Sequence, residues 1–322
     1  MKQNGPSQAG SDYPLAIRSQ ICYIMDMKQK PLTIAQFFKQ FPDDETCLQH
    51  IFDVRFGQGY ECPKCEKASN WYRIKAERAY SCQWCGHHLH PTVGTPFEKS
   101  RTALQLWFYA IYLFTTTRHG VAAKELERQL GVTYKTAWRM AGLIREHMAD
   151  VDGENPLGGF MKIVEVDETY IGGVNHGGGA GNKDGKTAIM GMLQRNGEVM
   201  TVVIPNRRKS TLQGHIVANV LAHTEIHTDD FMSYAGLDGT GHKYWHKTVN
   251  HSEEQWVSPT GTTTNRIEGF WSQLKRGIFG THIHVSPQHL WKYAKEAEYR
   301  FNRRHRPHTM FSELVSTYQP LI

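Results

Sequence analysis

The stretch Thr262–Gly280 reads TTTNRIEGFWSQLKRGIFG and predicts a helix with one apolar face and one charged margin. Glu268 and Lys275 are seven residues apart, so on a helix they share a face about 10 Å apart along the axis. Such a helix can hold a catalytic carboxylate beside a phosphate-binding group, although charges of this kind are more often solvated. The predicted buried stripe is Ile267, Phe270, Trp271 and Leu274.

Length and composition limit the classes of protein to which this chain can belong. The chain of 322 residues has room for two or three domains, and 39% hydrophobic with 21% charged residues is typical of a globular protein. We find no apolar run of membrane-spanning length and no signal-peptide pattern, which predicts a cytoplasmic, bacterial, nucleoid-associated protein. A net charge of +6 and a pI of about 8.9 permit a polyanionic partner without requiring one.

Cysteine spacing predicts a structural zinc site. The segment 60–90 reads YECPKCEKASNWYRIKAERAYSCQWCGHHLH and holds two CxxC pairs sixteen residues apart. Two such pairs suit tetrahedral Zn²⁺ in a zinc ribbon, and four thiolates leave no ligand position for the following histidines. The ribbon is basic, which fits either DNA binding or simple stabilisation of a small domain. The predicted ligands are Cys62, Cys65, Cys82 and Cys85; the predicted non-ligands are His87, His88 and His90; Cys22 and Cys47 are predicted to be ordinary thiols.

Residues 99–150 have a helical pattern throughout. The run GVAAKELERQLGVTYKTAWRM predicts a short helix, a turn at Gly131 and a second helix that opens at Thr133, which is typical of a helix-turn-helix. The second helix would present Tyr134, Lys135 and Arg139 to DNA. A plain helical hairpin within a bundle is the alternative.

The C-terminal half changes to a strand pattern. MKIVEVDETYIGG (161–173) predicts a strand with Glu165 and Asp167 on one face and Val164 and Val166 on the other. The glycine-rich segment 172–186 lacks the spacing of a phosphate-binding loop and is predicted to be a hairpin connection. Two more strands meet at Asn196-Gly197, and TEIHTDDFMSY predicts a fourth strand that ends in two aspartates.

Three separated carboxylates are the candidate chemistry. Asp167 on the first strand, Asp229 after the fourth strand and Glu268 on the later helix would together form an oxygen-rich site for Mg²⁺. Two such ions could activate a water or a 3′-hydroxyl and stabilise the leaving oxygen of a phosphodiester. Other carboxylates compete for each of these three positions. Glu165 and Glu168 compete with Asp167, Asp230 competes with Asp229, and Glu253 and Glu254 compete with Glu268. We interpret Glu165 as a residue that supports the site.

The motifs EVDETYIGG, HTDDFMSY and NRIEGFWSQLKRG follow a CPKC…CQWC ribbon and a predicted helix-turn-helix. In this order they resemble the zinc-ribbon bacterial insertion-sequence DDE transposases, specifically insertion sequence family 1595 (ISXO2-like), over residues 35–306. The resemblance implies an RNase H-like fold and Mg²⁺- or Mn²⁺-dependent DNA cutting and joining. It implies that Asp167, Asp229 and Glu268 form the catalytic triad and that Lys275 is the family's basic residue.

The expected fold is multidomain α+β, with an N-terminal zinc ribbon and helix-turn-helix followed by an RNase H-like α/β catalytic domain. The expected ranges are a tail at 1–31, a helical lead-in and ribbon at 32–98, the helix-turn-helix region at 99–150, the catalytic domain at 160–306 and a tail at 307–322. We expect Arg266, Lys275 and Arg276 to contact DNA. The expected partners are the element's terminal inverted repeats and target DNA, bound by a homodimer or larger assembly. The alternative is an inactive DNA-binding regulator or remnant.

Overall fold

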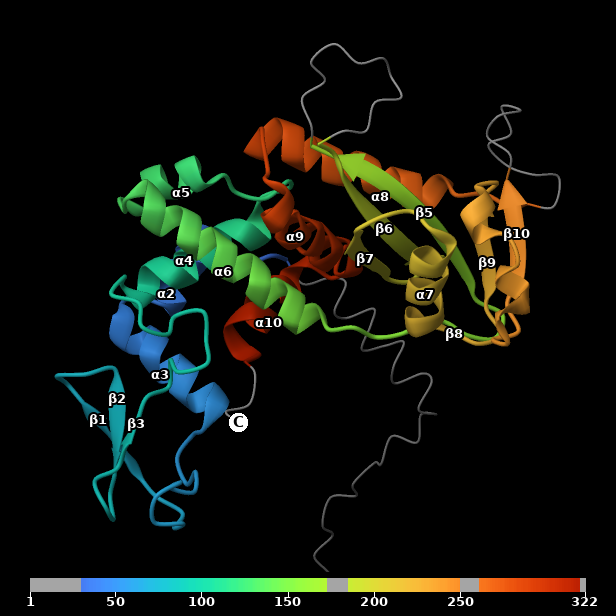
Figure 1. The fold of residues 1–322 in the computed structure, drawn as a ribbon. Coiled ribbons are helices and arrows are strands. Elements are labelled where there is room, and N and C mark those ends of the chain that lie inside the picture. Colours follow the sequence, from blue (N-terminus) through green and yellow to red (C-terminus); the bar gives the residue numbers. More distant parts are fainter. Residues whose placement is uncertain (1–29, 173–184, 250–260, 319–322) are drawn as a thin grey trace, which may run out of the picture.

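The computed structural model describes residues 30–172, 185–249 and 261–318. A small sheet and a group of helices lie on one side, and a larger sheet with its covering helices lies on the other (Figure 1). Most of the predicted N-terminal tail, most of the glycine-rich connection, and Glu253 and Glu254 fall outside the described residues. Within the described ranges, no helix is long and apolar enough to cross a membrane.

The N-terminal region begins with two capped helices. The Thr33 hydroxyl accepts a hydrogen bond from the backbone N–H of Gln36 at 3.3 Å, and the Asp43 carboxylate accepts one from Thr46 at 2.8 Å. A three-stranded antiparallel sheet follows. The elements are α2 (Ile34–Gln40), α3 (Asp44–Arg55), β1 (Trp71–Ile74), β2 (Ala79–Cys82) and β3 (His88–Leu89).

Three helices follow the small sheet. The second helix ends at Gly131, whose φ of 64° is left-handed and therefore suits glycine. The third helix begins where the sequence predicts, since the Thr133 hydroxyl accepts a hydrogen bond from the Thr136 backbone N–H at 3.3 Å. These helices are α4 (Leu104–Thr116), α5 (Ala123–Leu130) and α6 (Tyr134–Asp152).

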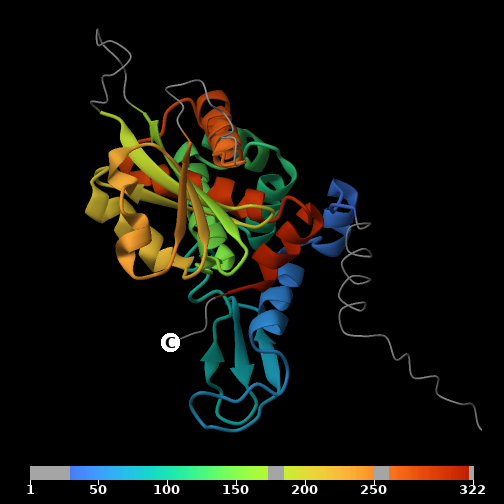
Figure 2. The same ribbon diagram turned by 90° about the vertical axis from the view of Figure 1, so that its right-hand side faces the viewer.

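The prediction of a tail at 307–322 is wrong for most of that range. Residues Met310–Ser316 form helix α10, which packs against α3, α4 and α6. Its apolar side chains are buried in the same core as those of α2 and α3, and Figure 2 shows this helix beside them. Seven residues are too few to reveal a helical period, which explains the error. The buried side chains are Met310, Phe311, Leu314 and Val315.

The larger sheet has the strand order β10-β9-β5-β6-β7. The first three strands along the chain form an antiparallel meander, and the two later strands run parallel to the first strand. Asn196, with φ of 58°, forms the predicted hairpin turn between the second and third strands. The strands are β5 (Ile163–Ile171), β6 (Thr187–Gln194), β7 (Val199–Ile204), β9 (Glu225–Asp229) and β10 (Trp245–Val249); a two-residue pair, β4 (Leu157–Gly158) with β8 (Val220–Leu221), lies apart.

Helices cover both faces of this sheet (Figure 1). On one face α7 (Lys209–Asn219) packs on Val164 and Val166, and on the other face α8 (Asn265–Arg276) and α9 (Leu290–Asn302) pack on Ile189. Because side chains alternate along a strand, Glu165 and Asp167 face the α8 side. The predicted alternation of β5 and the buried stripe of α8 are therefore confirmed.

Candidate active site and metal centre

The register of two parallel strands brings two aspartates side by side. In the β5–β9 ladder the last pair is Glu165 with His227. Asp167 and Asp229 lie two residues beyond that pair on their strands, so continuing the register sets them opposite each other on the same face. Asp229 is the last residue of β9 and is half-buried, whereas its neighbour Asp230 is exposed. Of the two aspartates, Asp229 is therefore the one held by the strand.

Glu268 enters from the helix that covers this face. The apolar stripe of α8 is fully buried and fixes the rotation of the helix on the sheet. Glu268 lies at the margin of the stripe, half-buried, and its carboxylate accepts a hydrogen bond from the Thr264 hydroxyl at 2.9 Å. Lys275 is half-buried two turns further along the helix, and Arg276 is exposed.

The three carboxylates interact electrostatically. Burial raises the pKa of Asp167 to about 7, and the negative charges of Glu168, Asp229 and Glu268 act in the same direction. Burial also raises the pKa of Asp229, against a hydrogen bond from the Phe231 backbone N–H. Repulsion of this kind is relieved by a divalent cation, and carboxylate oxygens are the ligands that Mg²⁺ prefers. Within the described ranges the three carboxylates do not approach one another as tightly as the cysteine cluster below.

Trp271 has a role that the sequence did not reveal. It was expected in the core, and it is only 4% exposed, but its indole Nε1 also donates a hydrogen bond to Asp167 Oδ2 at 3.1 Å. The space for the indole comes from Gly191 on β6, where a Cβ would lie 2.6 Å from the Trp271 ring. A glycine inside a predicted strand was the available signal for such a close approach.

The two competing glutamates on β5 have other partners. Glu168 points to the α7 side, where its carboxylate accepts hydrogen bonds from Arg207 and from the Tyr234 hydroxyl. Glu165 is fully buried and binds Arg195 together with the first turn of α8. The expectation that Glu168 points away and that Glu165 supports the site agrees with these contacts.

The residues expected to contact DNA lie on two separate helices. Tyr134, Lys135 and Arg139 are all exposed in the first turns of α6. The Lys124 ammonium group of α5 lies 5.4 Å from the centre of the Tyr134 ring, so α5 adds a positive charge to this surface. On α8, Arg266 is exposed and donates a hydrogen bond to the Asn196 side chain at 3.0 Å.

A cavity of about 280 Å³ lies between α8, α9 and the short π-helix η4 (Gly277–His282), but none of the three carboxylates lines it. Its walls are mainly apolar, with Phe270, Leu274 and Phe301 among them. The carboxylates instead lie on the neighbouring strands β5 and β9 and on the helix α8 that packs on β5.

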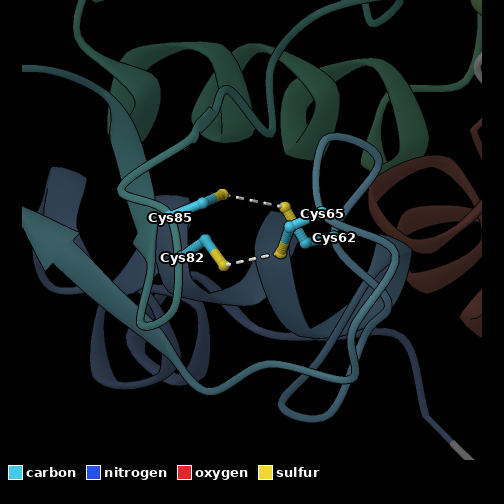
Figure 3. Close-up of side chains that lie close together, drawn as sticks. All are labelled: Cys62, Cys65, Cys82 and Cys85. Atoms are coloured by element: carbon cyan, nitrogen blue, oxygen red, sulfur yellow. Dashed lines mark hydrogen bonds between the residues drawn. The ribbon is translucent and has the colours of Figure 1, made fainter.

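Four cysteines converge at the tip of the small sheet (Figure 3). The Sγ atoms of Cys62 and Cys85 are 3.6 Å apart, and those of Cys65 and Cys82 are 3.9 Å apart. Zn–S bonds of about 2.3 Å in a tetrahedron require Sγ–Sγ distances of about 3.8 Å, whereas a disulfide requires about 2 Å. These two distances match a tetrahedral Zn²⁺ site, and all four Sγ atoms lie within 4.8 Å of one another, so the predicted ligand set is supported.

Hydrogen bonds prepare one of these thiols for metal binding. The Ser69 hydroxyl donates to Cys82 Sγ at 3.2 Å and the Trp84 backbone N–H donates at 3.4 Å. Burial acts to raise the pKa of Cys82, but these hydrogen bonds lower it to about 6. Both hydrogen bonds favour the thiolate, which is the form that binds zinc. Within the described residues no histidine joins the cluster.

Comparison with known proteins gives two family matches. Residues 156–302 match the model of the ISXO2-like transposase domain, and residues 42–88 match the model of the transposase zinc-ribbon domain. The chain is also 23% identical over 280 residues to an "Uncharacterized protein in transposable element ISH50" from Halobacterium salinarum, an alignment that covers 81% of this chain and 92% of that protein. The first matched segment contains the three carboxylates, and the second contains the four cysteines.

Proposed function

Because the chain belongs to the ISXO2-like transposase family, we propose that it binds the terminal inverted repeats of its own insertion sequence and catalyses Mg²⁺-dependent cleavage and strand transfer there. The observation that carries this proposal is the arrangement of Asp167 and Asp229 on two neighbouring strands and of Glu268 on the helix that packs on the first of them. The raised pKa of Asp167, caused by burial and by its carboxylate neighbours, is the electrostatic signature of that arrangement.

We assign the larger sheet to the RNase H-like fold. The support is its topology: an antiparallel meander of three strands, then two parallel strands added at the edge of the first strand, with helices on both faces. In this arrangement Asp167 lies on the first strand and Asp229 at the end of the next strand to join it. The fold therefore supplies two carboxylates from neighbouring strands, and α8 supplies the third.

The proposed chemistry has two steps at phosphorus, a hydrolysis followed by a transesterification. In the first, the oxygen of a water bonds to phosphorus at the element's end, the bond to the 3′-oxygen breaks, and the free 3′-hydroxyl remains. In the second, that 3′-oxygen bonds to phosphorus in target DNA and displaces a target 3′-oxygen, so no external energy source is needed. Bound Mg²⁺ or Mn²⁺, in a pair, would supply nucleophile activation and leaving-group stabilisation. Asp167, Asp229 and Glu268 would hold it through carboxylate oxygens.

DNA contact is assigned to three surfaces. We propose that α5 and α6 form a helix-turn-helix whose exposed Tyr134, Lys135 and Arg139 contact the inverted repeat. We propose that the ribbon adds contacts through Lys67, whose ammonium group lies 5.6 Å from the centre of the exposed Trp84 ring. On α8, the exposed Arg266 and Arg276 and the half-buried Lys275 would meet phosphate close to the carboxylates, which positions DNA without reading its sequence. Two ends must be held at once, so a dimer or larger assembly on DNA follows.

The proposal is tested by incubating end-labelled DNA that carries the element's own termini with Mg²⁺ or with EDTA. Wild type should nick at the terminus only with Mg²⁺ and should then join the labelled 3′-end to target DNA. Glu268→Gln keeps the side-chain shape, so it should bind DNA normally and lose nicking by at least about a hundredfold. Gln273→Ala, an exposed change on the same helix, is the matched control.

Two other outcomes point elsewhere. Tight binding by wild type with no nicking in Mg²⁺ or Mn²⁺ would support the regulator or remnant. Nicking without joining would support a nuclease of the same fold.

A further inference from the structure

We propose that Glu165 is a positioning residue that sets where α8 places Glu268, and thereby sets the affinity of the site for divalent metal. This inference rests on the proposed function of Glu268 as a metal ligand. The side chain of Glu165 does not reach the reacting atoms in the proposal; it acts through the backbone of α8.

The first observation concerns the start of α8. The residue before the helix, Thr264, provides no side-chain cap, although the first backbone N–H groups of a helix have no partner within the helix. Glu165 Oε2 accepts hydrogen bonds from the backbone N–H of Arg266 at 2.9 Å and of Ile267 at 3.2 Å. These are the second and third residues of the helix, the positions that a capping side chain normally serves. A carboxylate on strand β5 therefore caps α8, and Glu268 is the very next residue.

The second observation is the cost of burying this carboxylate. Glu165 is 0% exposed, and an ionised group at that depth is strongly destabilising unless it is paired and hydrogen-bonded. Arg195 Nε donates to Glu165 Oε1 at 2.8 Å, and the positive end of the α8 dipole faces Oε2. Both oxygens are thus satisfied, one by a side-chain cation and one by the helix. The contact is specific enough to fix the helix along its axis as well as in rotation.

The third observation is that Arg195 connects this contact to the other strand of the site. Its Nη2 lies 3.1 Å from His227 Nδ1 and donates to the Thr263 carbonyl at 3.2 Å. Glu165 and His227 are partners in the β5–β9 ladder, each two residues before a candidate metal ligand on the same strand face. A layer made of Glu165, Arg195 and His227 therefore lies one register step below the three carboxylates, and it joins β5, β9 and α8.

The test compares Glu165→Gln with wild type for nicking across a range of Mg²⁺ concentrations. Gln keeps the size of Glu but loses its charge, and its NH₂ group must face either Arg195 or the backbone N–H groups of α8, which all donate. We expect the Mg²⁺ concentration for half-maximal nicking to rise at least about tenfold, as for other residues that orient metal ligands. DNA binding in EDTA should stay within about twofold. Arg195→Lys keeps the positive charge but cannot contact Glu165, His227 and the Thr263 carbonyl at once. It should therefore raise the Mg²⁺ concentration for half-maximal nicking as well. If Glu165→Gln does not fold, this second variant tests the inference in its place.

Glu298→Gln is the matched control. Glu298 is also a buried carboxylate bound to a backbone N–H, that of Thr201 at 2.7 Å, and to a cation, Lys295, but it lies on α9 and its backbone partner is on β7, two strands from β5. The Glu298→Gln variant should have a lower Tm than wild type and the same dependence of nicking on Mg²⁺ concentration. An unchanged metal dependence in a folded Glu165→Gln variant would overturn the inference.

A second readout separates this inference from the proposed function. Hydrogen exchange of the first turn of α8 and Mn²⁺ binding followed by electron paramagnetic resonance need no catalysis. If wild type does not nick DNA, the proposed function fails, but faster exchange and weaker Mn²⁺ binding in Glu165→Gln would still support the positioning role. Wild-type exchange and Mn²⁺ binding in that variant would refute it.

Discussion

Gly191 lies directly opposite Asp167 in the β5–β6 ladder, and the Trp271 indole that donates to Asp167 occupies the space above this glycine. A Cβ at Gly191 would lie 2.6 Å from one indole carbon and 2.9 Å from the end of the Ile267 side chain. The absence of a side chain at one position on β6 thus allows α8 to approach the sheet closely. This approach sets the position of the candidate catalytic helix relative to Asp167.

Although Gly191→Ala adds only one methyl group, it should lower both the stability of the protein and its nicking activity. The added methyl forces the indole and α8 away from the sheet, and overpacking of this kind costs about 1–3 kcal/mol of unfolding free energy. We expect nicking to fall at least tenfold as the Trp271–Asp167 hydrogen bond is lost. Chemical denaturation and the nicking assay measure the two effects.

Gly214→Ala is the control for that substitution. A Cβ at Gly214, inside helix α7, would meet nothing within 4 Å. The Gly214→Ala substitution should raise the free energy of unfolding by roughly 0.5–1 kcal/mol, because alanine favours a helix more than glycine does, and it should leave nicking unchanged. Equal activity in the two alanine variants would contradict the role assigned to Gly191.

Asp167→Asn should stabilise the metal-free protein at alkaline pH. Burial and nearby carboxylates raise the folded-state pKa of Asp167 to about 7 from an ordinary value of 3.8. The ionised carboxylate therefore costs stability that grows as the pH rises from about 4 to about 7 and is constant above. We expect Asn to gain a few kcal/mol at pH 8 and nothing below pH 4.

Thermal unfolding of both proteins between pH 4 and pH 8, in EDTA, measures this difference. Added Mg²⁺ should stabilise wild type more than Asp167→Asn and so reduce the gap. Asp230→Asn removes an exposed carboxylate next to Asp229 and should change stability little. An Asp167→Asn variant no more stable than wild type at pH 8 would contradict the coupling of the three carboxylates.

Local patterns were enough to predict much of this structure. The alternation in β5, the apolar stripe of α8, the turn at Asn196 and the cap at Thr133 all depend on residues within a few positions of one another. The zinc site could also be predicted, because zinc geometry restricts the spacing of the four cysteines in the sequence. Each of these features could be read because its cause is local in the sequence.

Features that depend on distant partners were not predicted. Glu165 could be placed on the correct strand face, but its partners, Arg195 and the backbone of α8, lie 30 and about 100 residues away. The donation from Trp271 to Asp167 spans 104 residues. Helix α10 was missed because its packing against the N-terminal helices, and not its own short pattern, makes it a helix.

Zinc removal should unfold the ribbon and spare the larger sheet. The cysteine cluster closes the small sheet, and metal binding in such modules contributes directly to folding. We expect about one zinc per chain, lost in Cys82→Ser, together with faster hydrogen exchange over residues 60–90 and weaker DNA binding. Exchange in β5 and β6 should not change.

Cys47→Ala is the matched control for the zinc experiment. Cys47 lies in the core of the N-terminal helices, outside the cluster of four cysteines, and burial raises the pKa of its thiol to about 12. Its removal should lower stability by leaving a small cavity while the zinc content remains that of wild type. Full zinc content in Cys82→Ser would show that the assigned ligand set is wrong.

The last prediction concerns a buried charge cluster that joins α6 to α9. Glu296 is 4% exposed and accepts from Arg145 Nε at 2.7 Å and from Arg300 Nη2 at 2.9 Å. Gly120 is required beside it, since a Cβ there would lie 2.4 Å from Glu296 Oε1. Burial acts to raise the pKa of Glu296, but the two arginines lower it to about 2. Glu296→Gln leaves two buried cations without their counter-charge and should cost about 3–5 kcal/mol at pH 7.

The pH dependence of that loss follows from the direction of the shift. A carboxylate with a lowered pKa stabilises the folded state fully above its ordinary value of 4.5, and this stability disappears as the pH falls toward 2. Burial also lowers the pKa of the nearby His282 to about 4, whereas the charge of Glu296 acts to raise it. Acid therefore adds a second destabilisation below pH 6.5, which the Glu296→Gln variant shares down to about pH 4. The difference in unfolding free energy between wild type and Glu296→Gln should therefore be constant from pH 7 to about 5 and should shrink below 4.5. A difference that stays constant down to pH 3 would show that Glu296 is not held ionised by Arg145 and Arg300.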